Sequence, residues 1–186
     1  YAYSELSFAG DRLAQVFAEH YHLLREYASQ HPEAKLVLIG RDASDVISGN
    51  TSTWAMMQPL FTAEAKANVT YLGSVPYDEM AQHIHQATVC VFPTFAEALP
   101  VSWIEAMAMQ KAIVASAIGW AEEVIDDAEN GFLVQPTTHQ LYADKIVTLL
   151  NDASLRNEFG LKARQKVSQK FSIEVVAQQS VAFYHK

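Results

Sequence analysis

The amino-acid sequence predicts an α/β fold in which helices cover both faces of a parallel sheet. Short segments that are apolar at every position alternate with longer segments in which apolar residues recur at helical spacing. A strand without polar positions is typical of a parallel sheet that is buried on both faces. The chain has 186 residues, of which 50% are hydrophobic and 18% charged, and this length is enough for a single domain with its own core.

The first predicted element is a helix rather than a strand. Apolar residues recur at near-helical spacing over residues 11–30, and His31-Pro32 ends this pattern. Residues 35–40 are apolar after the initial lysine and finish on a glycine, which predicts a strand buried on both faces. Residues 41–68 are polar at first and then apolar, which predicts a loop followed by a helix.

The same alternation continues to the end of the chain. Strands are predicted at residues 69–73, 88–93, 112–116 and 131–134, and helices at residues 76–87, 100–110, 119–126 and from 138 onward, with breaks near 152 and 171–172. This pattern indicates a Rossmann-like sheet, in which ligands bind beyond the carboxyl ends of the strands. The chemistry is therefore expected in the segments after Ile39, Leu72, Phe92 and Ala115.

Charge and composition exclude several classes of protein. Lys+Arg number 13 and Asp+Glu 21, so the net charge is −8 and a broad basic surface for nucleic acid is not expected. The single cysteine, Cys90, excludes an internal disulfide framework and fits a reducing compartment. We expect a soluble cytoplasmic protein, because there is no signal-peptide pattern at the start and no transmembrane segment of about twenty apolar residues.

The loop after the strand at 88–93 carries the candidate site. Glu97 and Glu105 bracket the start of the helix predicted at residues 100–110, and proline at position 100 suits a first helical turn. The free N–H groups and the dipole of that turn suit a phosphate, while carboxylates accept hydrogen bonds from sugar hydroxyls. A ligand with a phosphate and a polyol would satisfy both. The alternative is that both glutamates are merely solvated, since acidic pairs are common.

A family resemblance favours the first interpretation. Residues 93–108, PTFAEALPVSWIEAMA, followed by KAIVAS at 111–116, resemble the Glu-x7-Glu region of glycosyltransferase family 4. Residues 36–40, 69–76, 119–125 and 130–134 agree with the same family in the same order. The resemblance covers roughly residues 11–185. It implies the nucleotide-sugar-binding C-terminal domain of a retaining enzyme with the two-domain GT-B fold, so that residues 1–186 would form one donor domain and the acceptor domain would lie outside this chain.

The resemblance also implies roles for individual residues. Glu97 would lie at the donor sugar, as a nucleophile or a stabiliser of the reacting centre, and Glu105 would hold the ribose hydroxyls. The backbone at Ala98, Leu99 and Pro100 would approach the sugar and the diphosphate, and the turn containing Ser74 and Val75 would lie near the base. Gly40 and Arg41 follow a strand end and are added to this donor site, with an Arg41–Asp42 surface ion pair as the alternative. No cofactor and no metal are expected.

Three departures from the family pattern affect the expectations. Many members have Gly-Phe-Gly where this chain has the triplet 98–100, which removes one N–H donor from the phosphate site. Members often have glycine and proline near Gln110 and Ala112, a difference that we interpret as a packing variation. The family's first strand, with its cationic residues for the diphosphate, has no match before Asp11. We therefore predict that the first strand is missing, and we expect weak donor binding and no turnover by this chain alone.

Other interpretations stay open at this point. One is a catalytically silent sugar-nucleotide-binding module for regulation or assembly, and another is a flavodoxin-like domain in which both glutamates lie on the surface. Cys90 is predicted to be buried and inert. His83 and His85 are two positions apart on a predicted helix, so they form a poor metal pair. The basic residues of the terminal helices are expected on a solvated face, although they leave open a peripheral membrane contact of the full enzyme; they are Lys162, Arg164, Lys166 and Lys170.

Overall fold

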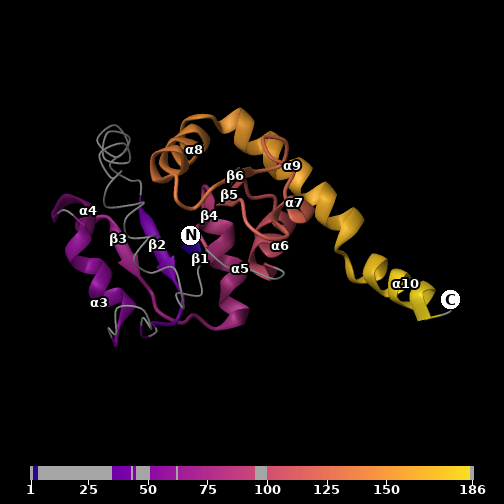
Figure 1. Cartoon of the computed structure of the whole chain (residues 1–186), viewed down its shortest axis with the longest axis horizontal. Helices are drawn as coiled ribbons and strands as arrows, with labels where there is room; N and C mark the ends of the chain where they lie inside the picture. Colours follow the sequence, from indigo (N-terminus) through magenta and orange to yellow (C-terminus); the bar gives the residue numbers. More distant parts are fainter. Residues whose placement is uncertain are drawn as a thin grey trace.

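A computed structural model describes residues 2–3, 35–42, 44, 51–61, 63–94 and 100–184 of the chain. These residues form a parallel sheet with the strand order β3-β2-β1-β4-β5-β6 (Figure 1). The strands are β1 (Ala2–Tyr3), β2 (Leu36–Ile39), β3 (Val69–Tyr71), β4 (Cys90–Phe92), β5 (Ile113–Ser116) and β6 (Phe132–Val134). The predicted parallel sheet is confirmed, whereas the helix expected over residues 11–30 lies outside the described residues.

The helices that alternate with the strands also follow the prediction. They are α3 (Thr53–Met57), the 3-10 turn η1 (Gln58–Leu60), α4 (Ala63–Ala67), α5 (Tyr77–Gln86), α6 (Val101–Ala108), α7 (Ala121–Val124), α8 (His139–Asn151), α9 (Ala153–Lys170) and α10 (Ile173–Tyr184). The breaks expected near residues 152 and 171–172 separate the last three helices. Asp152 makes the first break, because its side chain accepts a hydrogen bond from the Leu155 N–H and so begins α9.

The strand order distinguishes a Rossmann-like sheet from a flavodoxin-like sheet. The order 3-2-1-4-5-6 is that of dinucleotide-binding Rossmann folds, whereas flavodoxin-like sheets have the order 2-1-3-4-5. The flavodoxin-like interpretation is therefore wrong. The order reverses between β1 and β4, and in such sheets the crevice for the ligand opens at this switch point, beyond the carboxyl ends of the strands.

The prediction of a missing first strand is also wrong. Ala2–Tyr3 fills the central position of the sheet, where it pairs in parallel with β2 on one side and with β4 on the other. A strand of two residues is too short to show an apolar run, so the sequence pattern gave no sign of it. The neighbouring strands position it through the backbone hydrogen bonds that they offer on both sides.

The sheet separates two apolar cores, because successive side chains of a strand point to opposite faces. On one face, Leu38, Val91 and Val114 pack with buried residues of α3, α4, α8 and the start of α9. On the other face, Ile39, Phe92 and Ile113 pack with α5, α6, α7 and the later part of α9. The central strands predicted from continuously apolar segments are thus covered on both sides. The edge strand β3 is not buried, because Thr70 is exposed and Val69 and Tyr71 are half-buried.

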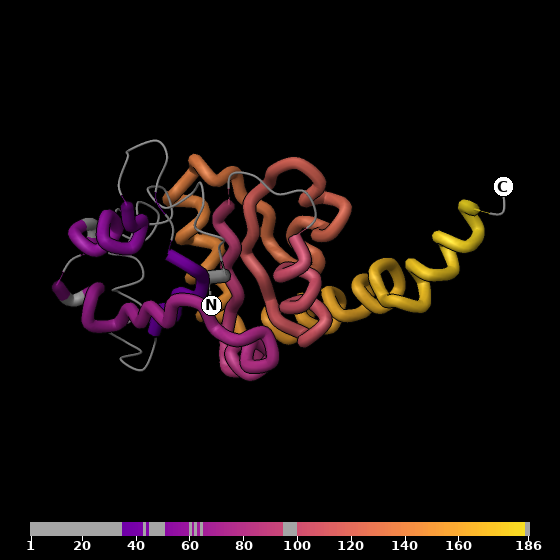
Figure 2. Tube along the Cα trace, turned by 90° about the horizontal axis from the view of Figure 1, so that it is seen from below, coloured from indigo at the N-terminus to yellow at the C-terminus, as the bar shows by residue number. Residues whose placement is uncertain are grey.

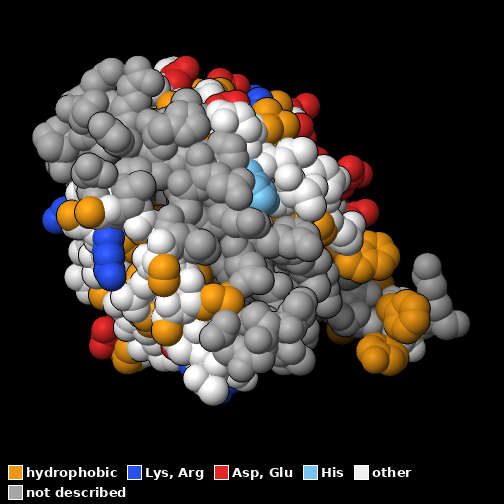
Figure 3. Space-filling model, turned by 60° about the vertical axis from the view of Figure 1, so that its left-hand side comes forward, with side chains coloured by type: hydrophobic (Ala, Val, Ile, Leu, Met, Phe, Trp, Pro, Cys, Tyr) orange, Lys and Arg blue, Asp and Glu red, His pale blue; other side chains and the backbone are white. Residues whose placement is uncertain are grey.

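The C-terminal helix α10 lies away from the sheet and extends beyond α9 (Figures 1 and 2). It buries none of its residues. Its most exposed hydrophobic side chains are Ile173, Tyr184 and Phe183, at 84%, 84% and 74% of their full accessible surface. Hydrophobic side chains gather at this end of the molecule in the space-filling view (Figure 3). The helix therefore contributes to neither core.

The end of α6 explains the unusual residue at position 110. Gln110 has a left-handed backbone with φ 59°. Its N–H donates to the Met107 carbonyl, and the Lys111 N–H donates to the Ala106 carbonyl. This is the Schellman arrangement, which favours glycine at the left-handed position. The left-handed backbone gives a physical reason for a glycine at this position that the interpretation as a packing variation did not include.

Replacing Gln110 by glycine is expected to stabilise the fold by about 1 kcal/mol, since a side chain at a left-handed position costs about that much. Urea unfolding of the two proteins measures the difference. The matched control is Gln165→Gly at an exposed position inside α9, which is expected to destabilise by about 1 kcal/mol. A loss of stability in both variants would contradict the assignment of strain to Gln110.

Candidate functional site

The loops that follow β2 and β3 are joined at the carboxyl edge of the sheet. The Gly40 N–H donates to the Gly73 carbonyl at 3.0 Å, and the Tyr71 hydroxyl donates to the Gly40 carbonyl at 2.8 Å. Gly73 has φ 67°, a conformation that glycine adopts without steric cost. The turn continues through Ser74, which is exposed, and Val75, which is half-buried. Two of the predicted donor-binding segments therefore form one continuous edge.

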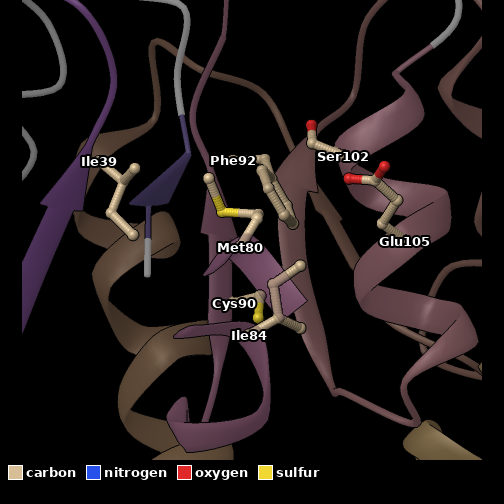
Figure 4. A pocket seen from close by; sticks show the side chains of 7 residues that line it. All are labelled: Ile39, Met80, Ile84, Cys90, Phe92, Ser102 and Glu105. Atoms are coloured by element: carbon tan, nitrogen blue, oxygen red, sulfur yellow. The ribbon is translucent and has the colours of Figure 1, made fainter. Parts of the chain in front are cut away.

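A small pocket lies beside these loops, between α5, α6 and the strands. Figure 4 shows its lining side chains, which are Ile39, Met80, Ile84, Cys90, Phe92, Ser102 and Glu105. Its interior volume is about 10 Å3, which is room for one water molecule. The lining is apolar apart from the Cys90 thiol, the Ser102 hydroxyl and the Glu105 carboxylate. The pocket therefore forms an apolar floor with a polar rim supplied by α6.

Glu105 is half-buried in the second turn of α6, and its carboxylate has a partner from another helix. The Tyr77 hydroxyl, at the start of α5, donates to Glu105 Oε1 at 2.6 Å. This hydrogen bond and the negative charge of Glu105 raise the pKa of the Tyr77 phenol above its ordinary value of 10.0, so the phenol stays protonated and able to donate. Glu105 is thus hydrogen-bonded to a residue of another helix, a contact that the alternative of a solvated glutamate did not include.

The beginning of α6 supplies backbone donors near Glu105. Pro100 is buried and stands at the N-cap, where its carbonyl accepts from the Trp103 N–H at 3.0 Å. The N–H groups of Val101 and Ser102 belong to the first turn, which leaves donors without intrahelical partners. These groups and the positive end of the helix dipole suit an anion. Glu97, Ala98 and Leu99, expected in the loop before Pro100, lie outside the described residues.

Asp42 has a structural role at the start of α3. Its Oδ2 accepts from the Ser52 hydroxyl at 2.6 Å, and its Oδ1 accepts from the Trp54 N–H at 3.0 Å. Asp42 thus holds the entry to this helix, a role that neither alternative for Arg41-Asp42 included. The Arg41 side chain is exposed directly after Gly40, at the edge that carries the joined loops.

The remaining candidates outside the motif have structural explanations. Cys90 is fully buried in β4, which confirms its predicted burial, and burial raises the pKa of its thiol. His83 is half-buried on α5 while His85 is exposed, as expected for side chains on different faces. Across the part of the chain that the structure describes, no group of three or more His, Cys, Asp or Glu residues is arranged to hold a metal ion.

Sequence reasoning missed two residues of the site. Tyr77 received no role because it belongs to a different segment from Glu105, 28 positions away. Ser102 received none because a serine in the first turn of a helix is ordinary. The only available signal was that both residues begin helices that follow strands of the sheet, and hence lie at its carboxyl edge.

The strand order defines the protein as an α/β domain of the Rossmann type, with a polar rim beside its switch point. The chain belongs to the glycosyl transferases group 1, whose family model matches residues 14–166. This match includes both Glu97 and Glu105.

Individual proteins that are similar to the chain agree with the assignment. The chain is 28% identical over 172 residues to alpha-maltose-1-phosphate synthase of Mycolicibacterium smegmatis, which covers 89% of the chain and 44% of that protein. Among solved structures, sucrose-phosphate synthase from Thermosynechococcus elongatus superposes with a TM-score of 0.74 at 26% identity, over 95% of this chain and 41% of that one. The architecture is therefore that of one half of a GT-B glycosyltransferase.

Two further structures share the fold. The C-terminal domain of a group 1 glycosyl transferase, LpcC of Francisella tularensis, gives a TM-score of 0.70 at 21% identity, over 89% of this chain and 80% of that one. Anabaena HepE in complex with UDP-glucose gives 0.70 at 23% identity, over 88% and 44%. The chain spans 26% to 44% of the length of the curated relatives first matched. Within the described residues, no helix combines the length and apolar character that crossing a membrane requires.

Proposed function

We propose that this chain binds the nucleotide-sugar donor of a retaining glycosyltransferase, of the hexosyl-transferring class (EC 2.4), at the carboxyl edge of its sheet. The observation that carries the proposal is the position of Glu105. Glu105 is half-buried in the second turn of α6, within the segment that resembles the family motif. An anion and a diol at this edge would be matched by backbone donors and by a carboxylate respectively.

The proposed roles follow from the charges that develop during transfer. Cleavage of the bond between sugar and diphosphate leaves negative charge on the diphosphate, which the start of α6 would stabilise. Positive charge develops at the sugar carbon, where a carboxylate such as Glu97 would stabilise it or attack it. Glu105 would accept hydrogen bonds from the ribose, and Gly40, Arg41, Ser74 and Val75 would complete the donor site. These steps use no metal and no cofactor beyond the donor itself.

Calorimetric titration of the chain with UDP, GDP and ADP tests the donor site. UDP is the first choice because HepE, which shares the fold, has been solved with UDP-glucose. We expect one of the three nucleotides to bind weakly, and its base is then the base of the donor. Absence of binding by all three, in a chain whose cooperative thermal unfolding shows that it is folded, would contradict the proposal.

The acceptor would be held by a second domain, and the chain by itself would bind the donor without turning it over. We propose a glycan or a lipid-linked glycan as the acceptor, because capsular polysaccharide and poly(ribitol-phosphate) glycosyltransferases are among the relatives. We place the protein in the cytoplasm, where a free thiol such as Cys90 persists. A peripheral membrane contact is less favoured because three lysines of α9 form ion pairs. Lys162 pairs with Glu158, Lys166 with Asp126 and Lys170 with Glu123.

Replacing Glu97 by alanine in the complete protein is expected to lower the turnover number more than it weakens donor binding, because its proposed contact strengthens as charge develops on the sugar. Steady-state kinetics measure the turnover number and the KM for the donor, with the glucose conjugate of whichever nucleotide binds as the donor. This variant also tests the alternative of a catalytically silent module. A complete protein that binds the donor but transfers and hydrolyses nothing would favour the silent module.

A further inference from the structure

We propose that Tyr77 is a positioning residue of the donor site, whose hydroxyl holds the Glu105 carboxylate in the orientation that accepts the ribose hydroxyls. The inference rests on the proposed function, because it assigns a support to the residue that would bind the ribose. It concerns a tyrosine outside the Glu-x7-Glu segment.

The two residues meet at the carboxyl edge although they belong to different helices. Tyr77 is the first residue of α5, four positions after the Gly73 turn, and Glu105 lies in the second turn of α6. Met80 and Ile84 anchor α5 in the same core as Trp103 and Ala106 of α6. The two helices are therefore fixed relative to each other, which keeps the backbone of Tyr77 at a distance from which its hydroxyl reaches the carboxylate.

The tyrosine ring itself is not part of that core. Tyr77 is 79% exposed, so packing does not hold its side chain in place. What orders it is the hydrogen bond of 2.6 Å to Glu105 Oε1, a length typical of a hydroxyl that donates to an ionised carboxylate. A large aromatic side chain that is exposed and yet bonded to the central carboxylate of the site is better explained by the site than by stability.

The hydrogen bond leaves Glu105 able to accept from a ligand. An ionised carboxylate offers about four acceptor positions on its two oxygens, and Tyr77 occupies one of them. The other oxygen, Oε2, and the second position of Oε1 can still accept from a vicinal diol. Because a long side chain loses conformational freedom when it binds, a partner that fixes it beforehand strengthens binding.

The test is Tyr77→Phe in the chain, titrated with UDP and with 2′,3′-dideoxyuridine diphosphate, which lacks both ribose hydroxyls. If the first titration selects GDP or ADP instead, the same pair is made with that base. We expect about three- to tenfold weaker binding of the ribonucleotide and less than a twofold change for the dideoxy form. In Glu105→Ala, the additional change Tyr77→Phe is expected to have no further effect.

The matched control is Tyr184→Phe, which removes the same hydroxyl from an 84% exposed tyrosine at the end of α10. Its binding is expected to equal that of the unchanged chain. Unchanged or tighter ribonucleotide binding by Tyr77→Phe, while Glu105→Ala weakens it, overturns the inference and leaves the proposed function intact. Equal weakening for both nucleotides also overturns it, because the effect would not depend on the ribose. If no nucleotide binds the unchanged chain, the proposed function fails and the inference fails with it.

Discussion

Replacing Gly160 by alanine is expected to destabilise the fold by about 3 kcal/mol, the largest loss of stability that we predict. Gly160 is buried in α9, and a Cβ atom there would lie 2.2 Å from the Gln110 carbonyl oxygen and 2.9 Å from its carbonyl carbon. Both atoms belong to the backbone of the turn that ends α6, so no side-chain rotation can relieve the overlap. Either α9 or this turn must move.

The sign of the change distinguishes this contact from ordinary helix propensity. In an exposed helix, glycine to alanine stabilises by about 1 kcal/mol, whereas the contact at Gly160 reverses the sign. Urea unfolding measures the free energy, and Asn157→Ala, at an exposed position of the same helix, is the control that is expected to change it by less than about 0.5 kcal/mol. Equal stability of Gly160→Ala and the unchanged chain would show that α9 does not approach α6 this closely.

Replacing Glu105 by alanine is expected to weaken nucleotide binding by about 1 to 3 kcal/mol, which corresponds to roughly 5- to 150-fold. The physical reason is the loss of a charged acceptor for the ribose hydroxyls, which would then be buried by the nucleotide without equivalent partners. The expected loss is larger than that for Tyr77→Phe, because Glu105 would touch the ligand while Tyr77 would act through it. Calorimetric titration with the nucleotide that binds the unchanged chain gives the value.

Two comparisons show whether a loss of affinity in Glu105→Ala comes from a less stable fold or from the loss of one negative charge. Glu105→Ala leaves the Tyr77 hydroxyl without its partner, but Tyr77 is 79% exposed and water can replace the carboxylate, so urea unfolding should change by less than about 1 kcal/mol. Glu129→Ala removes the same charge from an exposed residue in the turn before β6, at the amino edge of the sheet. Affinity unchanged in Glu105→Ala, or equally reduced in Glu129→Ala, would remove the ribose role.

Much of the fold could be predicted from local pattern. Residues 35–40 and 112–116 read as buried strands because every central position is apolar, and both became strands with side chains in the two cores. The break at Asp152 was visible because the side chain of that residue caps the next helix. The placement of Glu105 at the carboxyl edge followed from the same pattern, since a helix after a parallel strand begins there.

The sequence failed where a feature depends on partners far away in the chain. β1 has two residues, and their strand conformation comes from β2 and β4 on either side rather than from any local preference. Gln110 gave no sign of its left-handed backbone, which the end of α6 imposes with its carbonyl acceptors. The need for a glycine at position 160, 50 positions later, arises only because α9 packs against that turn.

The sequence by itself determined the alternation of strands and helices, the burial of both sheet faces and the segment in which the carboxylates of the site lie, because each depends on the periodicity of neighbouring residues. Only the tertiary structure decided the strand order that excludes a flavodoxin-like sheet and the contact that joins Tyr77 to Glu105. These depend on how separate helices and strands pack. The physical reason is that a hydrogen bond between residues 28 positions apart has no local signature, and forms only once both helices are fixed against one core.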